Sequence, residues 1–512
     1  MVKLRQQLLE RGMAAAKFHG HGTFLPEPPE FALVKKHWKS TKALLASLDL
    51  DTYEGYSPMR SFAPKSRLNV RRVSLLHPYD FILYTSLVLS LKDGIARSRL
   101  PADRVFSYRT EKTTSRQLYA SSPSFKDFKA AATEKVTANP RGFIGVTDIA
   151  DFFPRIYQHR LINALEAATT GTQREQIRAL EKMVSRFSEG ASYGIPIGPP
   201  ASRLLAEAVL IDVDSTLVSY GVDFIRFVDD YVIFSERPQD AEYAIRVLGE
   251  TLFLNHGLTL QTAKTKVMSA VDYSESYLTL HSEKEQNRRK LFEILGDSLY
   301  EETCYDDLDE DQKKEIDAYN LVEMLTEALG EGENVDYQEV SFILGRLSSL
   351  QKPELIGLVL LNLERLYPVA NAVASFFREF KSLGHEEYEE IGAALLRPLG
   401  KEDETRPSEF YTIWILHIFA QHARWDRGED LLRVFRETNS DVVRRYAALA
   451  LAVSGARAQA VKIKEYMNSG SPLCRTAMLL ATAKLGTDER KFLRKSLHLS
   501  DPLERLCSES QP

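Results

Sequence analysis

Three aspartates stand where the sequence predicts the ends of short strands, a placement that would suit metal-dependent chemistry. The segment GVTDIADFF, residues 145–153, begins as a β-branched strand that ends in Asp148. The segment FVDDYVIF, residues 227–234, places Asp229 and Asp230 between two apolar runs. Adjacent carboxylates repel each other unless a cation lies between them. Together the three aspartates would supply oxygen ligands for two magnesium ions and support an in-line nucleotidyl transfer.

Each segment also has an ordinary explanation when it is taken alone. An aspartate at a strand end is a common cap or turn residue, and an Asp-Asp pair can form an exposed turn without function. The segments gain weight from occurring together and in a fitting structural context. An apolar strand that ends in Asp148, followed by a hairpin that presents Asp229 and Asp230, favours nucleotidyl transfer over two unrelated turns.

The elements that must position these aspartates can be predicted from the pattern of apolar residues. Between residues 142 and 268, apolar runs of strand length alternate with helical stretches, which is typical of an α+β domain. The runs FIRFV and YVIFS are separated only by Asp229 and Asp230, so they are expected to form a tight hairpin with both carboxylates at its tip. The predicted domain spans residues 142–271 and comes after a non-repetitive region, residues 1–141.

The remaining residues, 272–512, are predicted to form an all-α domain. Strand-type runs disappear there, and segments resembling SDVVRRYAA recur with Arg445, Arg475 and Arg505 at a spacing of 30 residues. A period of this length indicates stacked helical pairs of the HEAT type, in which each unit buries its apolar face against the next. Such an array usually binds other molecules or assembles copies of the chain.

Composition excludes several classes of protein. A chain of 512 residues is expected to form two or three domains, and its hydrophobic fraction of 44% and charged fraction of 27% are typical of globular proteins. No apolar run is long enough to span a bilayer, and the charged N-terminal segment argues against a secretory signal, so a cytoplasmic protein without a membrane anchor is expected. The scattered Cys304, Cys474 and Cys507 support neither a disulfide framework nor a zinc finger.

One stretch ahead of the acidic segments is basic although the net charge of the chain is −5. A protein that binds nucleic acid needs clustered Lys and Arg to neutralise phosphates. The stretch could equally be a solvated face. Its basic residues are Arg60, Lys65, Arg67, Arg71, Arg72, Arg97, Arg99, Arg104, Arg109, Lys112 and Arg116.

With these segments in place, residues 57–268 resemble the reverse transcriptases. DIADFF matches the first acidic motif of that family, and FVDD matches its aromatic-X-Asp-Asp box. Between them, GIPIGPPASRLLAE at residues 194–207 is similar to the family's Gly-Leu-Pro-Gln-Gly loop and the helix after it. NHGLTLQTAKTKVM at residues 255–268 is similar to its Gly-Leu…Lys-Thr segment. The resemblance implies a fingers and palm fold, with the fingers in residues 1–141.

The resemblance also implies roles for individual residues. Asp148, Asp229 and Asp230, with the backbone of Ile149, would hold two Mg²⁺ ions, or Mn²⁺ in their place, and Lys264 would protonate the leaving pyrophosphate. The aromatic Phe153 would act as a steric gate against the 2′-hydroxyl of the incoming nucleotide, although a plain core aromatic is its ordinary alternative. The residues implied to bind the dNTP are Arg72, Arg109, Asp151, Phe152, Phe153, Pro196, Ile197 and Gly198. For Arg72 and Arg109 a structural ion pair is the alternative.

One departure from the family pattern bears on template use. Ile197 replaces the family's Gln, and Pro199 and Pro200 stiffen the next part of the loop. Together with the long helical part, this departure resembles the abortive-infection reverse transcriptases of bacterial antiphage defence, the AbiK-like group. That resemblance implies single-stranded DNA made without a template, possible priming by a protein hydroxyl, and a homo-oligomer assembled through the helical domain.

Two other hypotheses remain open at this point. The chain could copy an RNA or DNA template, as retron and group II intron enzymes do, with the same carboxylates. It could instead be a helical-repeat scaffold whose palm is a relic that binds without catalysis. The intact Asp148, Asp229 and Asp230 argue against a relic, because a cluster of like charges is costly to keep.

Overall fold

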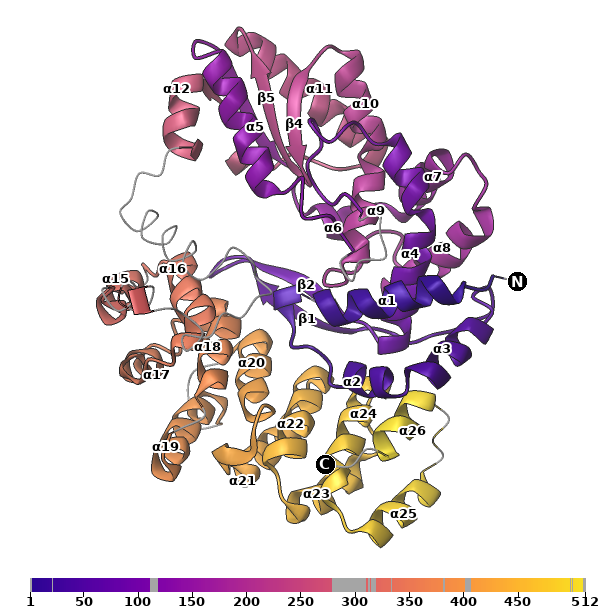
Figure 1. The fold of residues 1–512 in the computed structure, drawn as a ribbon, viewed down its shortest axis with the longest axis vertical. Helices are drawn as coiled ribbons and strands as arrows, with labels where there is room; N and C mark the ends of the chain where they lie inside the picture. Colours follow the sequence, from indigo (N-terminus) through magenta and orange to yellow (C-terminus); the bar gives the residue numbers. More distant parts are fainter. Residues whose placement is uncertain are drawn as a thin grey trace. The chain divides into compact units, whose positions relative to one another are not determined.

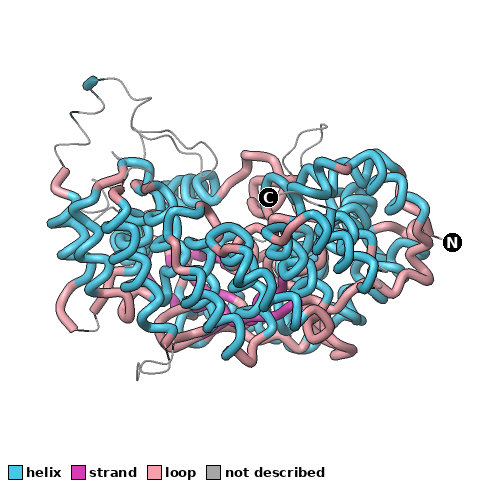
Figure 2. Tube along the Cα trace, turned by 90° about the horizontal axis from the view of Figure 1, so that it is seen from below, coloured by secondary structure: helices cyan, strands magenta, loops and turns pink. Residues whose placement is uncertain are grey.

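The computed structural model describes residues 2–20, 22–110, 118–278, 310–311, 314, 319–332, 334–380, 383–400, 407–497, 499 and 501–509. Cys304, together with Lys112 and Arg116 of the basic stretch, lies outside the described residues. Helix prevails along the described chain, as Figure 2 shows. The chain folds as two compact units, each assembled from separate stretches of sequence.

The first unit comprises Met1–Gly22, Lys35–Pro58 and Ser74–His281. Among its described residues, the strands are β3 (Phe143–Asp148), β4 (Asp223–Phe227), β5 (Asp230–Ser235) and β6 (Lys266–Ser269). Its helices are α1 (Gln6–His19), α3 (Trp38–Ser47), α4 (Pro78–Ser98), α5 (Phe125–Ala138), α6 (Phe152–Arg155), α7 (Gln158–Ala168), α8 (Arg174–Phe187), α9 (Ala201–Val209), α10 (Ile211–Ser219), α11 (Pro238–His256) and α12 (Ala270–Tyr273), with the short turn η2 (Thr262–Lys264).

The four strands of this unit form one antiparallel sheet in the order β4-β5-β3-β6. The predicted pairing of the two runs is confirmed, because β4 and β5 form a hairpin. The turn consists of Val228 and Asp229, however, so Asp230 is the first residue of β5 and not, as the sequence had suggested, part of the tip. Successive side chains of a strand point to opposite faces. Ile144 and Val146 therefore face a core shared with α5, whereas Gly145 faces Ile245 of α11. Figure 1 shows α5 and α11 beside β4 and β5.

The second unit comprises Thr23–Val34, Met59–Val73 and Ser282–Pro512. It contains most of α2 (Glu30–Lys36) and of the two-stranded sheet β1 (Met59–Pro64) and β2 (Val70–Leu75). Its other α-helices are α15 (Leu321–Leu329), α16 (Tyr337–Ser341), α17 (Ile356–Leu361), α18 (Ala370–Glu379), α19 (His385–Leu396), α20 (Glu409–Phe419), α21 (Gly428–Glu437), α22 (Asp441–Ser454), α23 (Arg457–Ile463), α24 (Pro472–Ala481), α25 (Thr487–Ser496) and α26 (Pro502–Glu509).

The helices of the second unit pack in succession. Helices α18, α20, α22, α24 and α26 each pack against the next of this series, while α21 packs against α23, and Figure 1 shows the stack. Side-chain contacts repeat with nearly the predicted period: Gln459 donates to Glu429 at 2.6 Å, and Asp441 accepts from the backbone of Ser471 at 3.2 Å. The assignment of these helices to the HEAT type stays a prediction.

Two early segments belong to this second unit. Residues 23–34 pack there through Glu30, and β1 packs on α20 and α22, where Ser61 donates to Glu409 at 2.5 Å. Sequence patterns alone place both segments in an N-terminal region, residues 1–141. Their membership of the second unit depends on contacts between residues distant in sequence, which local patterns do not reveal.

Two expectations from composition can be compared with the described residues. No helix among them is long and apolar enough to cross a membrane. The thiols of Cys474 and Cys507 are both buried.

Candidate active site

The three aspartates converge because of the register of the sheet. Asp148 ends β3, Asp230 begins β5, and the two residues are direct partners across the strands. Partners in an antiparallel pair carry their side chains on the same face, close together. Asp229 occupies the turn immediately before Asp230. The hairpin therefore brings a pair of carboxylates to the end of the strand that carries the third.

The electrostatics of this cluster are those of crowded like charges. Burial, and then the charges of Asp148 and Asp230, raise the pKa of Asp229 to about 7. Burial and the charge of Asp148 also raise the pKa of Asp230. Both effects disfavour the ionised carboxylate and are relieved by a nearby cation. The cluster is therefore a place where positive charge is stabilising.

Lys264 supplies such a charge in this structure. Its Nζ donates to Asp148 Oδ2 at 2.5 Å from the short turn η2. Although partial burial opposes it, the hydrogen bond and the charge of Asp148 raise the pKa of Lys264. The turn is tied to β3 by the hydroxyls of Thr147 and Thr265, which lie 2.7 Å apart. The structure thus brings Lys264 to Asp148, and its role toward the pyrophosphate stays a prediction.

A divalent metal fits the donor types of this cluster. Carboxylate and carbonyl oxygens are the ligands that Mg²⁺ prefers. Ile149 lies opposite Leu260 in an antiparallel bridge, whose hydrogen bonds are made by the neighbouring residues Asp148 and Ala150. Because backbone groups alternate in direction along a strand, the carbonyl of Ile149 points the other way, toward the side of β5. Among the described residues, however, no group of three or more His, Cys, Asp or Glu side chains is arranged to hold a metal ion. The metal ligands therefore stay a prediction.

The segment after β3 presents the predicted steric-gate residue. Asp151 has a left-handed backbone, with φ of +48°, and is exposed at the start of α6. Phe152 is buried, whereas Phe153 is only partly buried. Their rings pack edge to face, with 5.6 Å between the ring centroids. A partly exposed ring at Phe153 is compatible with contact to a ligand, whereas the ring of Phe152 is part of the core.

The loop predicted to lie against the nucleotide is held by main-chain bonds. Ile195 donates to the carbonyl of Phe153 at 3.2 Å, and the carbonyl of Ile197 accepts from Ser74 at the end of β2 at 2.9 Å. Pro196 is buried, whereas Ile197 and Gly198 are half-buried. The loop is thus adjacent to the predicted steric gate, and its contacts with a nucleotide stay a prediction.

The two arginines assigned to the triphosphate belong to different units. Arg109 donates to the backbone carbonyls of Leu100 at 2.5 Å and Val105 at 2.9 Å, and is half-buried. Burial, and then the charge of Arg99, lower its pKa to about 10. Arg72 is exposed on β2, in the second unit. These contacts of Arg109 are with backbone carbonyls and not with a carboxylate, and its role toward the nucleotide stays a prediction.

Sequence reasoning missed a buried ion network beneath the hairpin. Arg226 of β4 bonds Asp214 through Nε at 2.9 Å and through Nη2 at 2.5 Å, and its Nη2 lies 3.1 Å from Glu207. Although burial opposes charge, Asp214 and Glu207 raise the pKa of Arg226, so it stays protonated. Charged residues inside apolar runs, as in FIRFV and RLLAEAVLIDVD, were the pattern that could have predicted this network.

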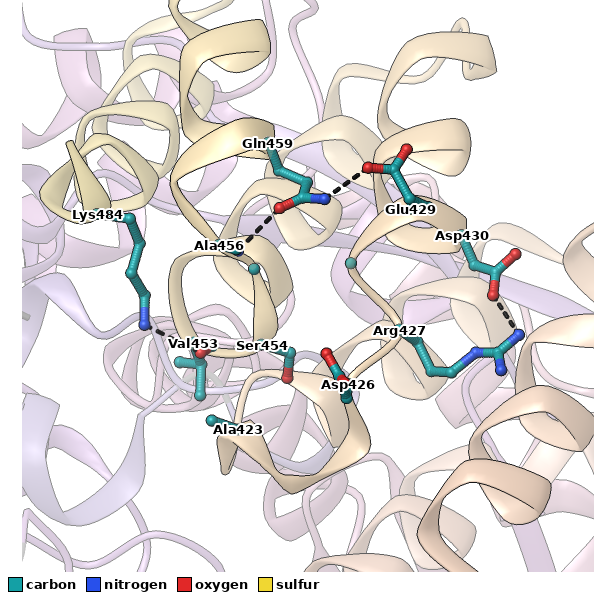
Figure 3. Close-up of a pocket in the computed structure, with 12 residues that line it drawn as sticks. Ala423, Asp426, Arg427, Glu429, Asp430, Val453, Ser454, Ala456, Gln459 and Lys484 are labelled. Carbon is teal, nitrogen blue, oxygen red and sulfur yellow. Dashed lines mark hydrogen bonds and ion pairs between the residues drawn. The ribbon is translucent and has the colours of Figure 1, made fainter. Parts of the chain in front are cut away.

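A separate pocket of about 450 Å³ lies in the second unit, near the ends of α21, α22 and α23. Figure 3 shows an ion pair between Arg427 and Asp430 at this pocket. Gln459 bridges Glu429 and the backbone of Ala456, and Lys484 donates to the carbonyl of Val453 at 3.3 Å. None of the residues predicted to act in catalysis lines this pocket.

Comparison with solved structures gives only a weak likeness. Truncated apo telomerase from Candida tropicalis matches at 11% identity and a TM-score of 0.33, over 46% of this chain and 54% of that one. Telomerase from Candida albicans with a fragment of telomeric RNA matches at 11% identity and a TM-score of 0.35. This match covers 72% of this chain and 68% of that one. This chain thus spans about half the length of the first structure. At these TM-scores the likeness carries no argument.

The comparison with protein families is more informative. No curated protein matches the chain. Residues 92–299 match the family described as reverse transcriptase (RNA-dependent DNA polymerase). This match contains β3, the β4–β5 hairpin, Lys264 and the loop that begins at Gly194. Residues 92–299 are therefore similar to a reverse transcriptase domain, and this part of the chain carries all three aspartates.

Proposed function

We propose that the chain makes DNA from dNTPs at Asp148, Asp229 and Asp230, with two divalent metal ions. The observation that carries this proposal is the convergence of the three carboxyls, where burial and mutual repulsion raise the pKa of Asp229 to about 7. A cluster of this kind is costly without a cation. When bound, Mg²⁺ or Mn²⁺ would stabilise the charge that develops on the transferred phosphoryl group.

Two further side chains would act on the dNTP. Lys264 holds a proton beside Asp148 on an ammonium that is largely exposed, and it could give that proton to the leaving pyrophosphate. Phe153 would lie under the sugar, where its ring leaves no room for a 2′-hydroxyl. These roles assign acid catalysis to the first residue and sugar selection to the second.

Incubation of the purified chain with Mg²⁺ and labelled dNTPs, with and without an added template, tests the proposal. Incorporation by the natural chain that is absent in Asp229→Asn is expected. A chain that incorporates no dNTP with Mg²⁺ or Mn²⁺ under either condition would overturn the proposal.

We further propose that synthesis does not follow a template and yields single-stranded DNA. An amide at position 197 could hydrogen-bond around the nascent base pair, whereas the branched apolar side chain of Ile197 offers only contact area. Pro199 and Pro200 stiffen the loop beside it. Losing one polar contact need not stop the chemistry, which depends chiefly on positioning and metal electrostatics.

A template-copying RNA-directed DNA polymerase is the second candidate, and the family match favours it, because that family is described as an RNA-dependent DNA polymerase. Under this alternative, Ile197 packs harmlessly and the rest of the cleft reads the template. A homopolymer template separates the two functions. Incorporation of only the complementary dNTP would favour template copying and remove the untemplated proposal.

We base the proposed biological role on the order of domains along the chain, which resembles that of the AbiK-like group. A cytoplasmic antiphage role by abortive infection, with priming by a protein hydroxyl, fits a polymerase joined to a long helical unit. The stacked helices of the second unit would then assemble copies of the chain. Phage plating on cells that carry the chain or its Asp229→Asn variant tests this role, since protection should require the carboxylate.

A further inference from the structure

Val228, which precedes the aspartates at the hairpin tip, has a left-handed backbone with φ of +58°. A β-branched side chain disfavours this conformation, whereas glycine adopts it readily. Strain of this kind persists only where the surrounding structure over-determines it, and it gathers at functional sites. The surroundings must therefore hold Val228 in a conformation that its own side chain opposes.

Two side chains hold the backbone of Val228. Its N–H donates to Ser107 Oγ at 2.9 Å, and its carbonyl accepts from Arg226 Nη1 at 2.7 Å. Ser107 and Arg226 have no exposed surface, and Val228 is 7% exposed. Both backbone polar groups of a buried turn residue are thus satisfied by side chains, and either bond is lost if the residue leaves this conformation.

A buried ion network fixes both of these side chains. Glu207 accepts from Ser107 at 2.5 Å and lies 2.6 Å from Arg99 and 3.1 Å from Arg226. With Asp214, which Arg226 also bonds, two guanidinium groups are balanced by two carboxylates. Removing a charged member would leave an unpaired buried charge. The Ser107 hydroxyl is neutral, so it can be removed without that cost.

The chain segment that carries Ser107 runs beside β4. Phe106 donates to the carbonyl of Arg226 at 3.0 Å, and Arg226 donates to the carbonyl of Arg104 at 2.8 Å, as a parallel bridge. These main-chain bonds bring Ser107 alongside Val228. The hydroxyl is thus positioned by backbone pairing rather than by a long flexible side chain.

We propose that Ser107, together with Arg226, is a positioning residue that keeps Val228 left-handed and thereby sets where Asp229 and Asp230 stand. This inference rests on the proposed catalytic role of the two aspartates. Partners that orient metal ligands typically change metal affinity or activity by roughly 10–100-fold when they are removed. Ser107 acts through the Val228 backbone, so its effect depends on which residue occupies position 228.

A double-mutant cycle between the two positions tests the proposal. The variants are Ser107→Ala, Val228→Gly and the combination of both, with Ser86→Ala as the matched control. Ser86 is likewise buried, but its hydroxyl donates to the carbonyls of Leu8 and Ile82. For each chain, kcat and KM for dNTP, the affinity for Mn²⁺ by calorimetry and the melting temperature are measured.

The expected result is a rescue of function without a rescue of stability. Ser107→Ala should lower kcat and Mn²⁺ affinity by about 10–100-fold, with a smaller change in KM. The double variant should have a kcat and an Mn²⁺ affinity at least about 10-fold higher than those of Ser107→Ala, because glycine adopts the left-handed conformation without the hydroxyl. The same change removes a buried side chain, so the melting temperature should fall further. A merely structural role of Ser107 would instead make activity follow the melting temperature.

Three outcomes would overturn the proposal. They are equal losses in Ser107→Ala and Ser86→Ala, additive losses in the double variant, and Mn²⁺ binding that Ser107→Ala leaves unchanged. Mn²⁺ affinity also separates this inference from the proposed function. If the chain makes no DNA but Val228→Gly still restores the Mn²⁺ affinity lost in Ser107→Ala, the positioning role stands and the proposed polymerase function fails. If Asp229→Asn binds Mn²⁺ as tightly as the natural chain, the positioning role is refuted.

Discussion

Glu30 and Arg445 form a buried ion pair although 415 residues separate them. Arg445 Nη1 and Nη2 lie 2.6 and 2.7 Å from the two carboxylate oxygens of Glu30, and neither side chain has exposed surface. Thr476 also donates to Glu30 at 2.5 Å. The pair fastens α2 to α22 and α24 within the second unit. A segment near the N-terminus is thereby part of the core of the helical unit.

We expect Glu30→Ala to destabilise the second unit strongly, because it leaves the guanidinium of Arg445 buried without its partner. Breaking a buried pair in this way typically costs about 3–5 kcal/mol. Replacing both residues by apolar ones should cost less than the sum of the single losses, since no charge is then stranded. Denaturant unfolding measures this. Glu465→Ala, at the exposed pair with Lys462, is the control and should change stability little.

The same pair gives a pH dependence of stability. Although burial alone would raise it, the charge and hydrogen bonds of Arg445 hold the pKa of Glu30 below its ordinary value of 4.5. A lowered pKa means that the stabilisation is complete above pH 4.5 and is lost as pH falls toward the lower folded-state value. The stability advantage of the natural chain over Glu30→Gln should therefore shrink below about pH 4.5. An advantage that is constant down to pH 3 would contradict this.

Sequence patterns predicted the parts of the fold that depend on neighbouring residues. The β4–β5 hairpin follows from two apolar runs and a two-residue turn, and β3 from one β-branched run. The docking of α2 could not be predicted, because PEPPEF at residues 26–31 carries turn residues and Glu30 is normally an exposed type. Only the distant Arg445 explains its burial.

Asp229→Asn should abolish incorporation while leaving the fold intact. The change removes one of three crowded charges, so the melting temperature without metal should hold or rise. Stabilisation by added Mg²⁺ or Mn²⁺ should fall, because the chain loses a ligand. Asp240→Asn, which removes a partly exposed charge in the first turn of α11 beside Arg237, should change neither property. Clear polymerisation by the purified Asp229→Asn chain would refute the catalytic assignment.

Phe153→Ala should admit ribonucleotides. The ring is only partly buried beside the fully packed Phe152, so its removal opens space at the surface where the sugar is proposed to lie. Competition between rNTPs and dNTPs measures the preference. Phe253→Ala removes an exposed ring of α11 and serves as the control. Sugar preference that is equal in the natural chain and Phe153→Ala would mean that the ring only packs.

Sequence patterns account for the positions of the three carboxylates but not for those of the two arginines. Asp148, Asp229 and Asp230 are fixed by strand register, which period-two patterns encode. Arg109 has bonds to the carbonyls of Leu100 and Val105, and these depend on a local fold with no sequence pattern. An arginine suits backbone carbonyls and phosphates alike, since it offers five donors to either.

The final prediction concerns Ile197, which we expect to uncouple synthesis from a template. Its backbone is held where the carbonyl accepts from Ser74 at 2.9 Å, and its side chain is half-buried. Substitution should therefore change the side chain without moving the loop. In Ile197→Gln, an amide can again hydrogen-bond near the base pair, so the share of products complementary to an added homopolymer should rise.

Ile197→Leu is the matched control for that experiment. It keeps an apolar side chain of the same volume, and such swaps usually cost little stability. Products of the natural chain and of Ile197→Leu should both ignore the homopolymer, whereas those of Ile197→Gln should match it more often. Sequencing the three products measures the difference directly. If the natural chain already incorporates only the complementary dNTP, Ile197 does not prevent template reading, and template copying replaces the untemplated proposal.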